Sequence, residues 1–358
     1  MIAVMEWLWF FSLLLLTGYH MVIFRRRPSP RSLSIIEWPG VSIVIAHKND
    51  STALRENLES LLSQDYPLFE IIIIDDHSNP FEKSNLEYFI SGHSGVKLLS
   101  SDTSGKKHAI TKGINSATHD LILCTDADCK PSSNKWIKKM IESGRGLAAV
   151  LGYSPYEKKS GWLNLLIRFE TIMTAMQYIS WTLAGKPYMG VGRNMLYPRS
   201  LFLQLDPYKE IAAPYGDDDL WVQQLSDHIR IKVCDDPLAH VMTQAPATWK
   251  EWINQKHRHM SAGHYYKNKL LWQPGIYGMM LFLHWAILPL LIAASFWWKW
   301  CPVLLIGLLI RWFVYNSWTR KLGDKDTVKW YPVLELNYAI YLGMMGIYTW
   351  MNKRKKWN

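Results

Sequence analysis

The sequence has few cysteines, and those it has follow no zinc-binding pattern. Four cysteines among 358 residues are too few for a disulfide scaffold, and their number fits a reducing compartment. Cys124 and Cys129 flank an acidic motif, but their separation matches no zinc-ligand spacing, so we interpret them as buried or incidental thiols. These absences argue against a disulfide-built extracellular module and against a zinc finger.

Nucleic-acid recognition motifs and a dinucleotide fingerprint are also missing. The glycine-rich stretch 188–197 (YMGVGRNMLY) lacks the strand–GxGxxG–helix spacing of dinucleotide-binding proteins. The net charge of +10 is partly local, because residues 25–27 (RRR) and 353–356 (KRKK) stand beside apolar runs. Basic clusters in that position face the cytosol and anionic lipid. We therefore predict a membrane as a partner and no nucleic acid.

A cleavable signal peptide is absent as well. Residues 7–24 (WLWFFSLLLLTGYHMVIF) are long enough to cross a bilayer. In a signal peptide the basic residues come before the apolar run, whereas here they follow it. This order predicts an uncleaved anchor over residues 1–25, followed by a proline- and serine-rich linker over residues 26–40.

Three more apolar segments near the C-terminal end are candidate membrane spans: residues 276–297, 302–318 and 331–350. Four spans would place the basic tail and a cytosolic domain on opposite sides of the membrane. One late segment could therefore be re-entrant or interfacial instead of spanning the membrane. Arg311 and Glu335 place a charge in each of the last two segments, which makes these two the weaker candidates. Residues 162–183 are also apolar but include Arg168 and Glu170, so we predict a helix on the domain or at the membrane interface.

The middle of the chain alternates between strand and helix signals. Short β-branched or apolar runs occur at residues 41–46, 70–75, 96–99 and 121–125, with helical patterns between them. This alternation predicts an α/β domain with a largely parallel sheet. Ligands of such sheets bind at the carboxyl ends of the strands. Four aspartates fall at those predicted ends: Asp75, Asp76, Asp126 and Asp128.

Asp126 and Asp128 lie two residues apart directly after a hydrophobic strand. Carboxylate oxygens at this spacing suit Mg²⁺ or Mn²⁺, which would bridge the two phosphates of a nucleotide donor. Lys106, in a Gly-Lys-Lys element upstream, could place an ammonium group on the same phosphates. Asp75 and Asp76 could accept hydrogen bonds from a base or ribose, or could instead anchor a loop.

Two further motifs follow along the chain. Residues 215–220 (YGDDDL) place three carboxylates before a predicted helix, where one could act as a general base if the site is partly buried. An acidic helix N-terminus is the structural alternative. In residues 255–259 (QKHRH), Arg258 could bind a lipid head group or a diphosphate.

Together and in this order, these motifs resemble the membrane-bound members of glycosyltransferase family 2, which include ceramide glucosyltransferase and the cellulose and hyaluronan synthases. The resemblance covers residues 41–265. It implies a GT-A fold, in which a Rossmann-like, mostly parallel sheet is flanked by N- and C-terminal transmembrane helices. The implied organisation is a GT-A domain over residues 41–240, an interfacial segment over 241–275, transmembrane segments over 276–351 and a basic tail over 352–358.

The resemblance also implies roles for individual residues. The donor-binding residues would be Asp75, Asp76, Lys106, Asp126, Gln255 and Arg258. The metal would be held by Asp128 and Asp126, and the acceptor-proximal residues would be Gly190, Gly192, Asn194 and His259. Asp217–Asp219 stand where the family usually has Glu-Asp, and we choose Asp218 as the base, with Asp217 as the other candidate. His259 replaces the tryptophan of the family's Gln-x-x-Arg-Trp element.

We therefore predict an inverting, metal-dependent glycosyltransferase in the inner membrane, with its catalytic domain in the cytosol. The donor would be a nucleotide-sugar, with a UDP-sugar favoured, and the acceptor would be a lipid or lipid-linked molecule. Two alternatives are a processive polysaccharide synthase and a catalytically silent, nucleotide-binding membrane scaffold.

Overall fold

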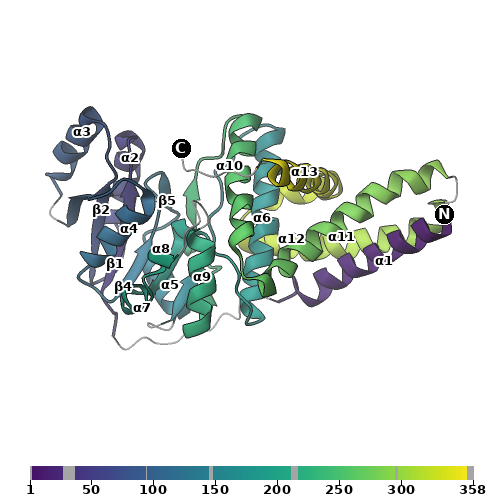
Figure 1. Cartoon of the computed structure of the whole chain (residues 1–358), viewed down its shortest axis with the longest axis horizontal. Helices are drawn as coiled ribbons and strands as arrows, with labels where there is room; N and C mark the ends of the chain where they lie inside the picture. Colours follow the sequence, from purple (N-terminus) through teal and green to yellow (C-terminus); the bar gives the residue numbers. More distant parts are fainter. Residues whose placement is uncertain are drawn as a thin grey trace.

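A computed structural model describes residues 2–26, 37–93, 95–144, 148–210, 217–294 and 297–352. An α/β domain and a group of long apolar helices lie at opposite ends of the molecule (Figure 1). The strands are β1 Val41–His47, β2 Phe69–Asp75, β3 Val96–Ser100, β4 Leu121–Cys124, β5 Cys129–Pro131, β6 Ala149–Leu151, β7 Met195–Pro198, β8 Ile231–Val233 and β9 Val241–Thr243. The helices are α1 Ile2–Val22, α2 Ser51–Leu62, α3 Pro80–Ile90, α4 Lys106–Asn115, α5 Trp136–Gly144, α6 Trp162–Leu183, α7 Arg199–Leu205, α8 Pro207–Glu210, α9 Asp217–His228, α10 Trp249–Ser261, α11 Asn268–Ala293, α12 Cys301–Leu322 and α13 Tyr331–Met351.

Seven strands form one sheet in the order β3-β2-β1-β4-β7-β6-β8. The pairs β1–β2, β2–β3, β1–β4 and β6–β8 are parallel, and β7 runs antiparallel to both β4 and β6. The predicted mostly parallel α/β sheet is therefore confirmed. Because β1, β2 and β4 run in the same direction, their carboxyl ends meet at one edge of the sheet.

The sheet has two covered faces, which explains why its central strands are apolar throughout. Alternate residues of β1 point to opposite sides: Ile43 packs with α2, α3 and α5, whereas Val44 packs in the cluster that contains α4 and α6. Both side chains are buried, as are the isoleucines of β2. Full burial of each such side chain contributes roughly 1.5–3 kcal/mol. At the start of α2, the side chain of Asp50 accepts a hydrogen bond from the Ala53 amide at 3.2 Å and so caps the helix.

Three helices are long and apolar enough to cross a membrane among the residues that the structure describes: Ile2–Val22, Trp272–Ala293 and Trp298–Leu322. They correspond to α1, α11 and α12, which run side by side away from the sheet (Figure 1). Only 17–22% of each apolar window is buried inside the protein, so most of this apolar surface faces outward. Such a surface is expected to lie in lipid.

The predicted fourth span forms α13, which is not among these three helices. It contacts α6 and α10 as well as α11 (Figure 1). At its far end, His257 on α10 is hydrogen-bonded through Nε2 to the Asn352 carbonyl at 2.7 Å. The end of α13 therefore lies against α10. The basic residues 353–356 fall outside the described residues.

Arg311 and Glu335, the two charges inside predicted spans, pair with each other. Arg311 donates from Nε and Nη2 to the two carboxylate oxygens of Glu335, at 2.9 and 3.0 Å. Both side chains are fully buried, and Tyr331 adds a hydrogen bond to Glu335 at 2.6 Å. This bidentate ion pair joins α12 to α13.

Segment 162–183, predicted to be a helix on the domain or at the membrane interface, forms α6 and is not among the candidate spans. Arg168 donates to Asp324 at 2.8 Å and to Asp326 at 2.9 Å, both in the connection between α12 and α13. Glu170 pairs with Lys256 of α10. The polar residues that interrupt the apolar pattern of α6 therefore attach it to its neighbours, and α6 and α10 stand between the sheet and the apolar helices (Figure 1).

Candidate functional site

A cavity of about 300 Å³ opens between the carboxyl edge of the sheet and the helices α6, α9 and α10. Its wall contains residues from eight separate stretches of the chain. The predicted site residues that line it are Lys106, Asp126, Asp128, Gly190, Gly192, Asp218, Gln255, Arg258 and His259. Residues separated by as many as 153 positions in sequence thus meet in one cavity.

Asp126 and Asp128 follow β4 and form the acidic part of the wall. Together with the thiol of Cys129, their oxygens offer ligand atoms that all lie within 4.8 Å of one another. Thr243 donates to Asp128 at 3.3 Å, and Lys106 donates to Asp126 at 2.7 Å. Two carboxylates so close together form a donor set that fits a hard divalent cation such as Mg²⁺ or Mn²⁺.

The charge of Asp126 is stabilised by its surroundings. Enclosure by protein raises the pKa of a carboxyl group, but the positive charges of Lys106, Arg193 and Arg258 outweigh this effect and lower the pKa of Asp126 below its usual value. Asp126 therefore remains a carboxylate, which is the form that binds a cation.

Lys106 reaches this position because α4 begins immediately after Gly105. The Gly105 amide donates to the Asp76 carboxylate at 2.7 Å, and this bond ties the start of α4 to the end of β2. Gly105 has a φ of +129°, which a residue with a side chain rarely adopts. The Gly-Lys element thus has a geometric basis in the bend that precedes the helix.

Asp75 and Asp76 are buried at the end of β2 and do not line the cavity. Asp75 accepts a hydrogen bond from the Ser78 amide at 3.3 Å, and the Asp76 carboxylate lies 3.8 Å from the Lys48 ammonium. Both aspartates hold the loops beside the site in this structure. Their predicted contact with a nucleotide base remains a prediction.

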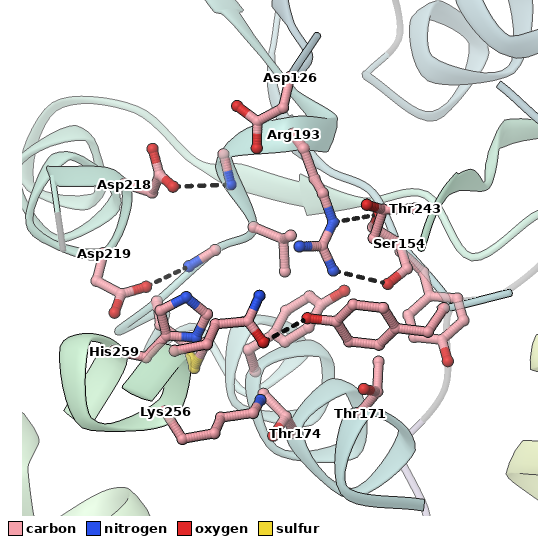
Figure 2. Close-up of a pocket in the computed structure, with 18 of the residues that line it drawn as sticks. Asp126, Ser154, Thr171, Thr174, Arg193, Asp218, Asp219, Thr243, Lys256 and His259 are labelled. Carbon is pink, nitrogen blue, oxygen red and sulfur yellow. Dashed lines mark hydrogen bonds between the residues drawn. The ribbon is translucent and has the colours of Figure 1, made fainter. Parts of the chain in front are cut away.

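The first turn of α9 faces the glycine-rich loop through Asp218 and Asp219. Asp218 accepts from the Gly192 amide at 3.1 Å, and Asp219 accepts from the Gly190 amide at 3.3 Å (Figure 2). Asp219 also accepts a short hydrogen bond from the Tyr266 hydroxyl. Of Asp217, only the helical backbone is described, so the prediction for its side chain lies outside the described residues.

Asn194 is placed behind the cavity rather than in its wall. Its side chain is fully buried, accepts from the Trp136 indole at 3.0 Å, and donates to the carbonyls of Tyr153 and Ala239 at 2.8 and 2.9 Å. In this structure Asn194 therefore fixes the base of the loop, and its predicted proximity to an acceptor stays a prediction.

Gln255, Arg258 and His259 project from α10 into the cavity. Gln255 accepts from the Tyr156 hydroxyl at 3.2 Å. His259 retains solvent access, yet its enclosure in the cavity, together with the charges of Lys256 and Arg258, lowers its pKa well below the usual value. The imidazole is therefore neutral near pH 7.

Sequence reasoning missed Arg193, which lies between two residues that it did select. Arg193 donates from Nε to the Ser154 hydroxyl at 2.6 Å, and its guanidinium lies 5.1 Å from the centre of the Tyr156 ring (Figure 2). It also missed Glu170 and Lys256, which face the same cavity. The one sequence feature that could have indicated Arg193 as a site residue is its position as a cation inside the glycine-rich stretch 188–197.

The sheet with acidic groups at its carboxyl edge defines the class of the protein, which has the GT-A glycosyltransferase fold. A mannosyltransferase from Pyrobaculum calidifontis, solved in complex with GDP-Man and Mn²⁺, is similar over 92% of this chain and 96% of that chain, with a TM-score of 0.60 and 15% identity. Residues 42–205 match the family described as Glycosyl transferase family 2. The chain therefore contains a family 2 glycosyltransferase domain, as the sequence predicted.

Similar curated relatives are poly-beta-1,6-N-acetyl-D-glucosamine synthases. The protein from Staphylococcus epidermidis is 25% identical over 67% of this chain and 59% of its own length. The protein from Staphylococcus aureus strain COL is 24% identical over 65% of this chain and 56% of its own length. The matched region thus spans little more than half of these relatives. The family match ends at residue 205, so Asp218, Gln255 and Arg258 lie beyond it.

Proposed function

We propose that the protein is a metal-dependent, inverting glycosyltransferase that moves a sugar from a nucleotide-sugar to a membrane-associated acceptor. The observation that carries this proposal is the convergence of the acidic pair Asp126–Asp128, the cations Lys106 and Arg258, and the carboxylate of Asp218 on one cavity. An acidic pair can hold a cation, the cations can bind phosphate, and a carboxylate can accept a proton.

The proposed chemistry is a single displacement. Lys106 and Arg258 bind the donor's diphosphate, and Asp126 and Asp128 would hold Mg²⁺ or Mn²⁺, which supplies positive charge against the two phosphates when bound. Asp218 takes the proton of the acceptor hydroxyl while the oxygen bonds to the anomeric carbon. The bond from that carbon to the phosphate oxygen breaks, and the nucleoside diphosphate leaves. Attack from the opposite face inverts the anomeric centre.

The donor class follows from the same charges and from the relatives. A diphosphate fits a cavity that combines two separate cations with an acidic pair. The curated relatives are poly-beta-1,6-N-acetyl-D-glucosamine synthases, and the structurally similar mannosyltransferase was solved with GDP-Man. We propose a UDP-sugar as the favoured donor and a GDP-sugar as its competitor.

The acceptor is proposed to be lipid-linked because apolar helices adjoin the site. Helix α6 contributes Glu170 and Thr174 to the cavity wall, and the same helix packs against α12 and α13. An acceptor held in a membrane would thus reach the cavity directly. Arg25 and Arg26 follow α1, which places the domain on the cytosolic side in this proposal.

A donor screen in membranes tests this function. Nucleotide release from UDP- and GDP-sugars is measured with and without Mn²⁺, and Asp128→Asn is expected to reduce release at least 100-fold. Asp102→Asn is the matched control, because Asp102 is an exposed carboxylate paired with Lys112 outside the cavity. Equal release by the wild type and Asp128→Asn would refute the metal assignment.

A processive polysaccharide synthase is a second candidate, and the names of the relatives favour it. Product length distinguishes the two functions. A ladder of polymers formed with one labelled nucleotide-sugar supports processive synthesis, whereas a single added residue supports single transfer.

A further inference from the structure

One end of the cavity is not used by the proposed donor chemistry. Glu170, Thr171 and Thr174 of α6 and Lys256 of α10 line it. In Figure 2, Lys256, Thr171 and Thr174 lie at the opposite end of the cavity from Asp126. A donor bound near the acidic pair would therefore leave this wall for another ligand.

The wall is built around an enclosed ion pair. The Lys256 ammonium lies 2.5 Å from the Glu170 carboxylate, and Thr174 donates to the same carboxylate at 3.1 Å. Lys256 and Glu170 are 8% and 6% exposed. Removing such charges from water costs free energy that their mutual attraction often fails to recover. Because this pair lies in a cavity wall, its polar atoms can contact a ligand, and we take it as evidence for a ligand at this end.

The charge of this wall differs from that of the donor end, which is the end of the cavity near Asp126 and Asp128. At the donor end, Lys106, Arg193 and Arg258 provide three cations that can bind a diphosphate. At the other end, Glu170 neutralises Lys256, and threonine hydroxyls and the Tyr156 ring complete the wall. Hydroxyls, paired charges and an aromatic ring can exchange hydrogen bonds with a neutral ligand and pack against its apolar face.

We propose that this wall, which we define as Glu170, Thr171, Thr174 and Lys256, binds a neutral, polyhydroxylated head group of the acceptor rather than a phosphate. The inference rests on the proposed function, since it names the substrate class of the same site. The head group is a sugar or polyol that carries an apolar tail. Glu170 and Lys256 hold its hydroxyls, and one hydroxyl is directed toward Asp218.

Two probes with the same tail test the proposal. Octyl β-D-glucoside carries a neutral sugar head, and octyl phosphate carries an anion. The protein in lipid nanodiscs should transfer labelled sugar to octyl β-D-glucoside and not to octyl phosphate. Preference for octyl phosphate, or transfer to neither probe, would overturn the assignment.

Variants of the wall locate the binding site. Glu170→Gln and Thr174→Val should each raise the KM for octyl β-D-glucoside about tenfold, the loss expected for one hydrogen bond, with kcat changed less than threefold. Glu170→Gln should also increase the use of octyl phosphate, because it leaves the positive charge of Lys256 without its partner. An unchanged KM in both variants would contradict the proposal that this wall binds the head group of the acceptor.

Matched controls keep the test independent of folding. Glu142→Gln changes another lysine-paired carboxylate outside the cavity, and Thr182→Val changes a threonine of α6 that is buried and does not line the cavity. Both should transfer normally. Thr174→Val carries the test if Glu170→Gln fails to fold. Absence of nucleotide release by the wild type from every nucleotide-sugar would instead contradict the proposed function itself.

Discussion

At the scale of single residues, the loop between α6 and β7 is defined by how closely it approaches α9. The Gly192 amide bonds to Asp218, and a Cβ atom added at Gly192 would overlap the carboxylate of Asp218. The glycine is therefore needed for a close approach, not for a positive φ. The loop and the proposed base fix each other's positions.

Gly192→Ala should displace Asp218 and reduce transfer about 100-fold, since small misplacements of a reacting group cost that much. Gly263→Ala is the matched control, because a Cβ at Gly263 would meet nothing within 4 Å. The measurement is the rate of sugar transfer at saturating donor. Full activity of Gly192→Ala would mean that the position of Asp218 does not matter for the reaction.

His240 makes folding of the catalytic domain depend on pH. It is buried against Tyr153, with ring centres 4.9 Å apart, and its Nε2 has no partner among the described residues. Burial lowers its pKa from 6.5 to about 4. Below pH 6.5 the unfolded chain takes up a proton that the folded protein does not, so stability is complete above pH 6.5 and falls toward pH 4.

The difference between a pKa of 6.5 and one of about 4 corresponds to about 3 kcal/mol. We expect His240→Leu to lose less stability than the wild type between pH 7 and pH 4, by up to this amount. Thermal unfolding of the detergent-solubilised protein at several pH values measures the difference between the two proteins. Parallel curves would show that His240 does not contribute to acid sensitivity.

At the scale of elements, the Arg311–Glu335 pair holds α13 against the apolar helices. Glu335→Ala leaves a buried guanidinium without its partner, which should destabilise the protein by roughly 3–5 kcal/mol. Asp102→Ala, which breaks an exposed pair with Lys112, should cost only about 0–1 kcal/mol. Denaturant unfolding in detergent measures both values.

The double variant Arg311→Met/Glu335→Leu provides the complementary test. It removes both charges, so no buried ion remains unpaired, and it should recover most of the stability lost in Glu335→Ala. If Glu335→Ala were as stable as Asp102→Ala, the pair would contribute nothing to the attachment of α13.

The long elements could be predicted from the sequence because their signals are local. The β-branched run of β2 and the apolar pattern of α6 give both elements to within a residue. The strands β5, β6, β8 and β9 have only three residues each, too few to show a period, and none was predicted. The antiparallel strand β7 was likewise read only as part of a glycine-rich loop.

The same distinction applies to the site. Acidic residues at strand ends were recognisable because the strand precedes them directly, as at Asp126 and Asp128. In the sequence, Arg311 and Glu335 are each a single charge inside an apolar segment. Their pairing across 24 positions depends on how α12 packs against α13, which sequence spacing does not reveal. The contacts of Glu170 with Lys256 span 86 positions and could not be derived from spacing either.

At the scale of the whole molecule, the direction of the apolar helices determines on which side of the membrane each part lies. Helix α1 leads into the catalytic domain, and α11 and α12 leave and return to it (Figure 1). Three crossings would therefore place α13 and the catalytic domain on the same side. A fourth crossing would have put the basic tail on the opposite side, against the usual preference of basic residues for the cytosol.

Single cysteines and a membrane-impermeant maleimide test this topology. The sites are Tyr88→Cys on α3, Trp298→Cys at the far end of the apolar helices and Trp350→Cys near the end of α13, all at least 69% exposed. Cys301→Ser removes the partly exposed native thiol, and the other three native cysteines are buried. Each cysteine is labelled in intact cells and in inside-out vesicles.

Trp298→Cys should react in intact cells, whereas Tyr88→Cys and Trp350→Cys should react only in inside-out vesicles. This outcome is expected if the three candidate spans α1, α11 and α12 cross the lipid while α13, which packs against α6 and α10, does not. Labelling of Trp350→Cys together with Trp298→Cys would instead show that α13 crosses the membrane. In that case α6, which packs against both α12 and α13, would lie between two membrane-spanning helices. An acceptor would then reach the wall on α6 from within the bilayer rather than from the membrane surface.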